Sequence, residues 1–144
     1  MRPHPFLRAY MAGIVVPTLF LLIIVSAFAT FRFALVPGRT IGDGLLVGSF
    51  ASVIVFPMAV VPNLWGIWNM LYLALRSRVR VSLGVHGALL PIILVPLGVL
   101  LTRELRVATI QLGFAMAVAP IAMAVYYLAW KYAVGFFNDE LGIG

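Results

Sequence analysis

The stretch from Tyr10 to Phe31 reads YMAGIVVPTLFLLIIVSAFATF and contains no charged side chain. It is long enough for the roughly 20 apolar residues that cross the hydrocarbon core of a bilayer. Arg32 follows it directly. We therefore predict a first membrane span at 10–31. A cleaved signal peptide is the alternative, but its apolar region usually has only about 7–15 residues.

The rest of the chain has the same apolar character. Hydrophobic residues make up 64% of its 144 residues and charged residues 10%, and the mean hydropathy is +1.14. Soluble domains have about 25% charged residues, because a small domain needs a largely polar exterior. Lipid must therefore surround most side chains. The net charge of +6 lies in the terminal segments and the links between apolar runs, so we expect contact with membrane lipids and no nucleic-acid partner.

Three further apolar runs follow the first, and we predict spans at 45–75, 83–101 and 107–130. The links at 76–82 and 102–106 are short, which makes neighbouring helices antiparallel. The predicted fold is all-α. It is a single transmembrane domain over residues 1–144, arranged as an integral membrane four-helix bundle with antiparallel, up-down helices.

The second run is too long for a straight span perpendicular to the membrane. As a helix, 45–75 would extend about 46 Å, whereas the hydrocarbon core is about 30 Å thick. Pro57 and Pro62 lie near its middle, and each removes a helical hydrogen bond. We predict a kink at 57–63, where Asn63 bonds either a freed backbone group or a neighbouring helix.

The distribution of basic residues predicts the orientation. A cytoplasmic N-terminus places six of them inside and four outside, a bias that favours this topology. The inside set is Arg2, Arg8, Arg76, Arg78, Arg80 and Lys131, and the outside set is Arg32, Arg39, Arg103 and Arg106. Tyrosines and tryptophans also concentrate at the span ends assigned to the inside. We predict that both termini are cytoplasmic, with dual insertion as the alternative.

Small residues recur at helical spacing in two of the spans. Gly44, Gly48 and Ser52 begin the second span, and Gly113 and Ala117 lie in the fourth. Small residues let membrane helices approach closely. Two interpretations stay open: packing within the bundle, or a docking face for another copy or another subunit.

Few polar side chains lie inside the spans. Asn63, His86 and Gln111 are the candidates for a ligand site or a pore lining, and the alternative for each is a hydrogen bond between helices. For His86 that alternative is a bond to a carbonyl or a lipid headgroup. Asn69 is expected at the membrane interface. Because the chain has no cysteine and His86 has no second ligand nearby, we predict no metal site and no cofactor.

The densest basic cluster comprises Arg76, Arg78 and Arg80, directly after an aromatic-rich helix end. Basic residues beside a membrane are attracted to anionic lipids. We therefore predict that these three arginines contact lipid headgroups.

No Asp, Glu, Lys or Arg lies within the predicted spans, so ion-coupled transport has no candidate residue. No nucleophile is paired with a base, which argues against an enzyme. The predicted function is that of a non-catalytic membrane protein that acts through helix packing, as an accessory or scaffold subunit of a membrane complex or as a homo-oligomer. The alternative is a small oligomeric channel or exporter lined by Asn63, His86 and Gln111.

Overall fold

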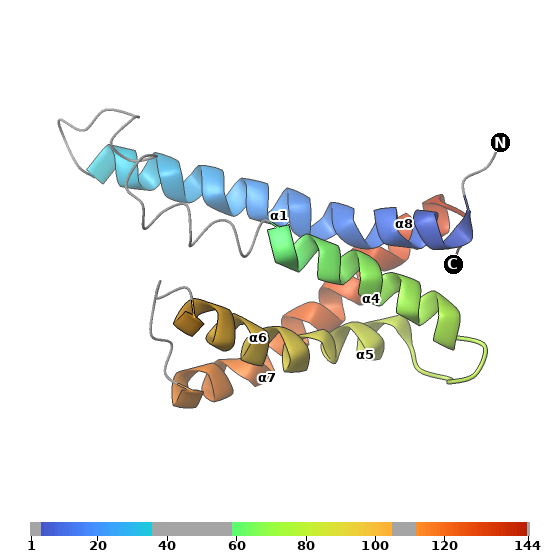
Figure 1. Ribbon diagram of the computed structural model, residues 1–144. Coiled ribbons are helices and arrows are strands. Elements are labelled where there is room, and N and C mark those ends of the chain that lie inside the picture. Colours follow the sequence, from blue (N-terminus) through green and yellow to red (C-terminus); the bar gives the residue numbers. More distant parts are fainter. Residues whose placement is uncertain (1–3, 36–58, 105–111, 144) are drawn as a thin grey trace.

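The computed structural model describes residues 4–35, 59–104 and 112–143, and every regular element in these ranges is a helix (Figure 1). The predicted all-α class is therefore confirmed. Three helical stretches are long and apolar enough to cross a membrane: Pro5–Ala27, Leu83–Leu100 and Met116–Glu140. Their lengths and compositions are those of a membrane protein. The predicted second span, 45–75, lies partly outside the described ranges.

The first helix, α1, spans Pro5–Leu35 and so extends beyond the predicted 10–31 at both ends. Pro17 lies inside it and has no N–H to offer the turn before it. In the same turn, the hydroxyl of Thr18 donates a hydrogen bond of 2.6 Å to the carbonyl of Ile14. Such local bonds keep a hydroxyl satisfied where water is absent.

The described part of the second run forms α4, Val61–Leu75. Pro62 lies in its first turn, a position that commonly tolerates proline because its fixed φ suits the start of a helix. At the other end, the N–H of Arg76 bonds the carbonyl of Tyr72 at 2.9 Å. The predicted kink at 57–63 falls partly outside the described residues and stays a prediction.

The third run contains two helices, α5 (Leu83–Ala88) and α6 (Leu90–Glu104), which are separated at Leu89. Pro91 has no N–H for the helical bond to residue 87. The N–H of Leu89 bonds the carbonyl of His86 at 3.3 Å, only three residues back. A proline therefore breaks the third run near its start.

The fourth run is helical from Leu112 to Glu140, past its predicted end at residue 130. It comprises α7 (Leu112–Leu128), the π-helix η2 (Ala129–Val134) and α8 (Gly135–Glu140). Lys131 does not end the helix. Its ammonium group lies 5.2 Å from the ring centre of Tyr132, an arrangement in which an aromatic face stabilises the cation.

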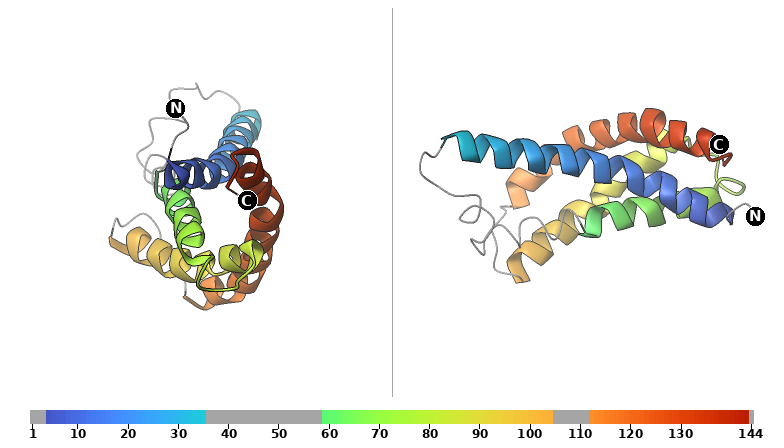
Figure 2. Two further views of the ribbon diagram at one scale, coloured as in Figure 1. Left: turned by 90° about the vertical axis from the view of Figure 1, so that its right-hand side faces the viewer. Right: turned by 90° about the horizontal axis from the view of Figure 1, so that it is seen from above.

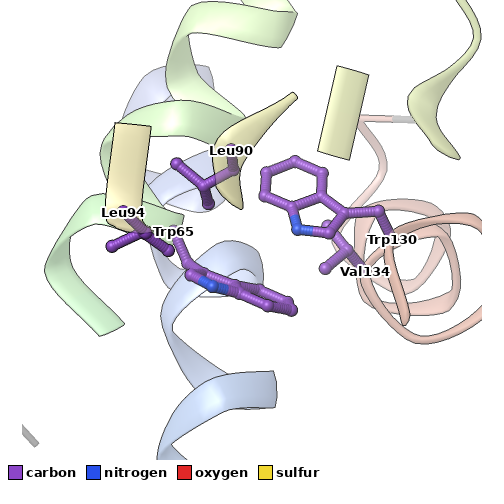
Figure 3. Close-up of a cluster of buried hydrophobic side chains, with 5 residues drawn as sticks. All are labelled: Trp65, Leu90, Leu94, Trp130 and Val134. Carbon is purple, nitrogen blue, oxygen red and sulfur yellow. The ribbon is translucent and has the colours of Figure 1, made fainter. Parts of the chain in front are cut away.

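The helices pack mainly as two pairs. α1 lies along α4, and α5 and α6 lie along α7 and η2. The start of α1, the end of α4 and α8 meet at one end of the molecule, and α1 diverges from α6 and α7 toward the other end (Figures 1 and 2). A buried cluster joins the two pairs (Figure 3), and it consists of Trp65, Leu90, Leu94, Trp130 and Val134.

Candidate functional site

Two buried amide side chains join three helices where α1, α4 and α8 meet. Asn69 of α4 is 1% exposed and Asn138 of α8 is 4% exposed. The Nδ2 of Asn69 donates to Asn138 Oδ1 at 2.7 Å and to the carbonyl of Ala9 in α1 at 2.8 Å. Asn138 Nδ2 returns a bond of 3.3 Å to Asn69 Oδ1. Asn69 is therefore buried between helices, and its expected depth at the membrane interface stays a prediction.

His86 links α5 to α4 through two reciprocal hydrogen bonds. Its Nε2 lies 3.0 Å from the carbonyl of Trp68, a bond that requires the ring proton on Nε2, and Trp68 Nε1 donates to the carbonyl of His86 at 2.8 Å. The imidazole stacks on the Trp68 ring at 4.8 Å, with Tyr72 at 5.3 Å and Trp130 at 5.9 Å. A carbonyl is thus the hydrogen-bond partner of this histidine, and aromatic rings surround it.

Asn63 is exposed on the first turn of α4 and bonds both its own helix and its neighbour. Its Nδ2 donates to the carbonyl of Ala59, and its Oδ1 accepts from the hydroxyl of Tyr10 in α1. Both structural tasks expected for Asn63 are therefore present. An amide side chain can make four hydrogen bonds, and its bonds to described residues account for two of them.

The three predicted ligand or pore residues do not form one cluster among the described residues. Asn63 bonds α1, whereas His86 is buried against α4 and η2. Gln111 lies outside the described ranges. A ligand or pore role for these residues stays a prediction.

Two tryptophans form the centre of the buried cluster between the helix pairs. The rings of Trp65 and Trp130 lie 5.4 Å apart, and Tyr126 lies 4.9 Å from Trp65. The indole N–H of Trp130 is buried without a hydrogen-bond partner in the described structure. Burial of aromatic surface therefore stabilises this contact at the cost of an unsatisfied donor.

Basic residues at the meeting point of α1, α4 and α8 hold the end of the chain. Arg8 Nη1 donates to the carbonyl of Leu141 at 2.6 Å, and Arg76 Nη1 donates to the carbonyl of Ile143 at 2.6 Å. Arg76, Arg78 and Arg80 are all exposed. The predicted contact of Arg76, Arg78 and Arg80 with lipid headgroups stays a prediction.

Comparisons of the chain with protein families, with characterised proteins and with solved structures found no match. Within the described ranges, no three His, Cys, Asp or Glu side chains are grouped as a metal site requires. The functional proposal therefore rests on the geometry of this chain.

The small residues that the sequence predicts at helix contacts are not the glycines that make close contacts in the described structure. Gly44, Gly48 and Ser52 lie outside the described ranges. A Cβ at Gly113 would meet no described atom within 4 Å, and Ala117 is exposed. Neither residue makes a close contact with the described helices, and a role for them in docking stays a prediction.

Close contacts occur instead at glycines that face large residues of a neighbouring helix. A Cβ at Gly13 would lie 2.6 Å from the carbonyl oxygen of Trp65, so α1 and α4 cross backbone to backbone. A Cβ at Gly84 would lie 2.8 Å from Cε2 of Tyr127, and one at Gly87 would overlap Trp130. Regular spacing within one helix does not reveal these positions, because each depends on the partner helix.

Asn138 is the polar residue that sequence reasoning missed. It lies eight residues after Trp130, where the fourth span is predicted to end, so it falls outside every predicted span. The available signal is Phe137 directly before it, which packs against the buried cluster of Ala9, Ala12 and Ile143.

Proposed function

We propose that this chain is a non-catalytic, multi-pass membrane protein that acts through helix packing, as an accessory or scaffold subunit of a membrane complex or as a homo-oligomer. Its helices form an antiparallel four-helix bundle with both termini in the cytoplasm. One observation carries this proposal. The buried polar side chains of the described helices, Asn69, His86 and Asn138, all bond groups of the chain itself.

That observation matters because a binding site needs a few polar groups that are free to orient its ligand. Here the buried amides and the imidazole already hold α1, α4, α5 and α8 together. Hydrogen bonds between helices are a common use of such residues in membranes. These side chains therefore support an architectural role more strongly than a catalytic or transporting one.

The face proposed for assembly is on α7. Gly113 and Ala117 lie one helical turn apart, and neither serves a close contact within the described structure. Phe114 is 67% exposed and Met116 is 65% exposed. Small residues beside large apolar ones allow another membrane helix to approach closely.

The alternative proposal is an oligomeric channel or exporter, and Asn63 is the residue that favours it. Its side chain is exposed, and its bonds to described residues use half of its hydrogen-bonding capacity. Polar groups at membrane depth often mark a solute pathway. In this alternative, Asn63 would face a lumen formed between copies of the chain.

Purification in mild detergent tests the scaffold proposal. The full chain should elute either with a stoichiometric partner identified by mass spectrometry or as a homo-oligomer of defined mass by light scattering. Gly113→Leu combined with Ala117→Leu should disrupt that assembly and leave the stability of the single chain unchanged. Ala74→Leu, at an exposed position on α4, is the matched control and should leave the assembly intact.

A flux assay in liposomes separates the two proposals. A scaffold protein should give no solute flux above that of empty liposomes. Flux that Asn63→Leu abolishes would refute the scaffold proposal and support the channel. A single chain that elutes without partner or self-association would also contradict assembly through α7.

A further inference from the structure

Two arginines from different helices converge on the short segment that follows α8. Arg8 lies near the start of α1, and Arg76 is the C-cap of α4. Their Nη1 atoms bond the carbonyls of Leu141 and Ile143, two residues apart in the chain. Gly142, between these residues, has a φ of 65°, so the segment turns sharply and both carbonyls are available to the arginines.

Among the described residues, these contacts leave most of each guanidinium unused. A guanidinium carries five N–H donors, and the contacts above use one nitrogen of each. Both acceptors are neutral carbonyl oxygens, so neither bond neutralises the charge. The Nε of Arg8 is buried and has no hydrogen-bond partner among the described residues. An anion beside the two guanidinium groups could add charge-assisted hydrogen bonds at the outer nitrogens that the described contacts do not use.

The surroundings of the two arginines combine a charged group with apolar surface. Phe6 and Leu7, next to Arg8, are 38% and 50% exposed. Arg8 and Arg76 lie near the ends of their helices, at the end of the molecule where α1, α4 and α8 meet (Figure 1). A helix end is where a spanning segment reaches headgroup depth. A phosphate could therefore contact the arginines while acyl chains contact the apolar side chains.

We propose that Arg8 and Arg76 bind the phosphate group of an anionic phospholipid. Arginine suits this role because its planar fork matches the oxygens of a phosphate. The lipid-binding proposal requires membrane insertion of the chain but not its scaffold role. Either proposal can therefore be refuted without the other. A general attraction between a basic loop and anionic lipids would depend on Arg78 and Arg80 as well. The proposed phosphate site depends on Arg8 and Arg76.

Native mass spectrometry of the full chain in detergent tests this choice. Phosphatidylglycerol is titrated against phosphatidylcholine for the wild type, for Arg8→Gln with Arg76→Gln, and for Arg78→Gln with Arg80→Gln. Both variants lose the same charge. The first should lose about 30-fold in affinity for phosphatidylglycerol, the effect of two arginines at an anionic surface. The variant with Arg78→Gln and Arg80→Gln should keep nearly the wild-type affinity for phosphatidylglycerol. Equal losses would show diffuse attraction and overturn the proposal.

A second pair of variants keeps the test decisive if the first variant unfolds. Arg8→Lys with Arg76→Lys retains the charge and a donor for each carbonyl but loses the planar fork. It should bind phosphatidylglycerol more weakly than Arg78→Lys with Arg80→Lys, and equal affinity would overturn the proposal. Inorganic phosphate in large excess should not displace the lipid. Displacement would assign the site to a water-soluble phosphate instead.

Discussion

At the scale of single residues, buried amides connect helices that are far apart in the sequence. Asn69 and Asn138 are separated by 69 positions and bond each other across the α4–α8 contact. Lipid offers no hydrogen bond to an amide that loses its partner. Each asparagine therefore depends on the other, and on Ala9, to offset the cost of burial.

Replacement of Asn138 by Leu should destabilise the protein through loss of this pair. One ordinary hydrogen bond between membrane helices is worth about 0.6–1.7 kcal/mol, and the amide left on Asn69 adds part of a desolvation penalty of about 1–3 kcal/mol. Reversible unfolding in mixed detergent and denaturing micelles measures the free energy of unfolding.

The double variant Asn69→Leu with Asn138→Leu completes the test. It removes both polar groups, so its loss should be smaller than the sum of the two single losses. Strict additivity would show that the two amides do not interact and would contradict the described contact.

At the scale of helices, close approach depends on glycines that face large side chains. Gly87 of α5 lies directly against Trp130 of η2, where a Cβ would overlap the indole. Gly113 of α7 faces open space in the described structure. The two residues are chemically identical, so their different surroundings predict opposite outcomes for one substitution.

Gly87→Ala should destabilise the chain by about 1–3 kcal/mol, the usual cost of overpacking a core. Gly113→Ala should be neutral or stabilise it by up to about 1 kcal/mol, because alanine is the better helix former. The free energy of unfolding of both variants, measured in the same detergent, provides the comparison. A destabilisation by Gly113→Ala as large as that by Gly87→Ala would contradict this placement of α7.

At the scale of the whole molecule, basic residues collect where α1, α4 and α8 meet. Arg8 and Arg76 are held there by carbonyls of the final segment, and Arg78 and Arg80 are exposed in the following loop. Cytoplasmic segments of membrane proteins carry an excess of Lys and Arg. The proposed cytoplasmic position of both termini would place these arginines on the inside, and it stays a prediction.

Reporter fusions test this orientation. A reporter active only in the cytoplasm should be active when fused after Gly144 and inactive when inserted within 37–44. Neutralising Arg76, Arg78 and Arg80 together should disturb the orientation more than neutralising Arg103 and Arg106, because only the first group anchors the proposed inside loop. Activity of the 37–44 fusion in the cytoplasm, or equal activity on both sides, would refute the single topology.

The sequence by itself determined the helical class, the membrane character and the approximate position of the apolar runs. Hydropathy suffices for these properties, because a chain in lipid must satisfy its backbone within each segment and must keep charges near the ends. The run at 83–101 illustrates this, since a described helical stretch from Leu83 to Leu100 coincides with it.

Only the tertiary structure decided which polar residues are interior and which glycines are indispensable. The hydropathy pattern does not show that Asn69 is buried inside the protein, or that its partner is Asn138, 69 positions away. The close helix contact at Gly87 is apparent only in the structure, where Trp130 packs directly against this residue. These contacts depend on how each helix is rotated and how far it is shifted along its neighbour. Apolar residues surround each helix in a membrane, so hydropathy carries little information about that rotation.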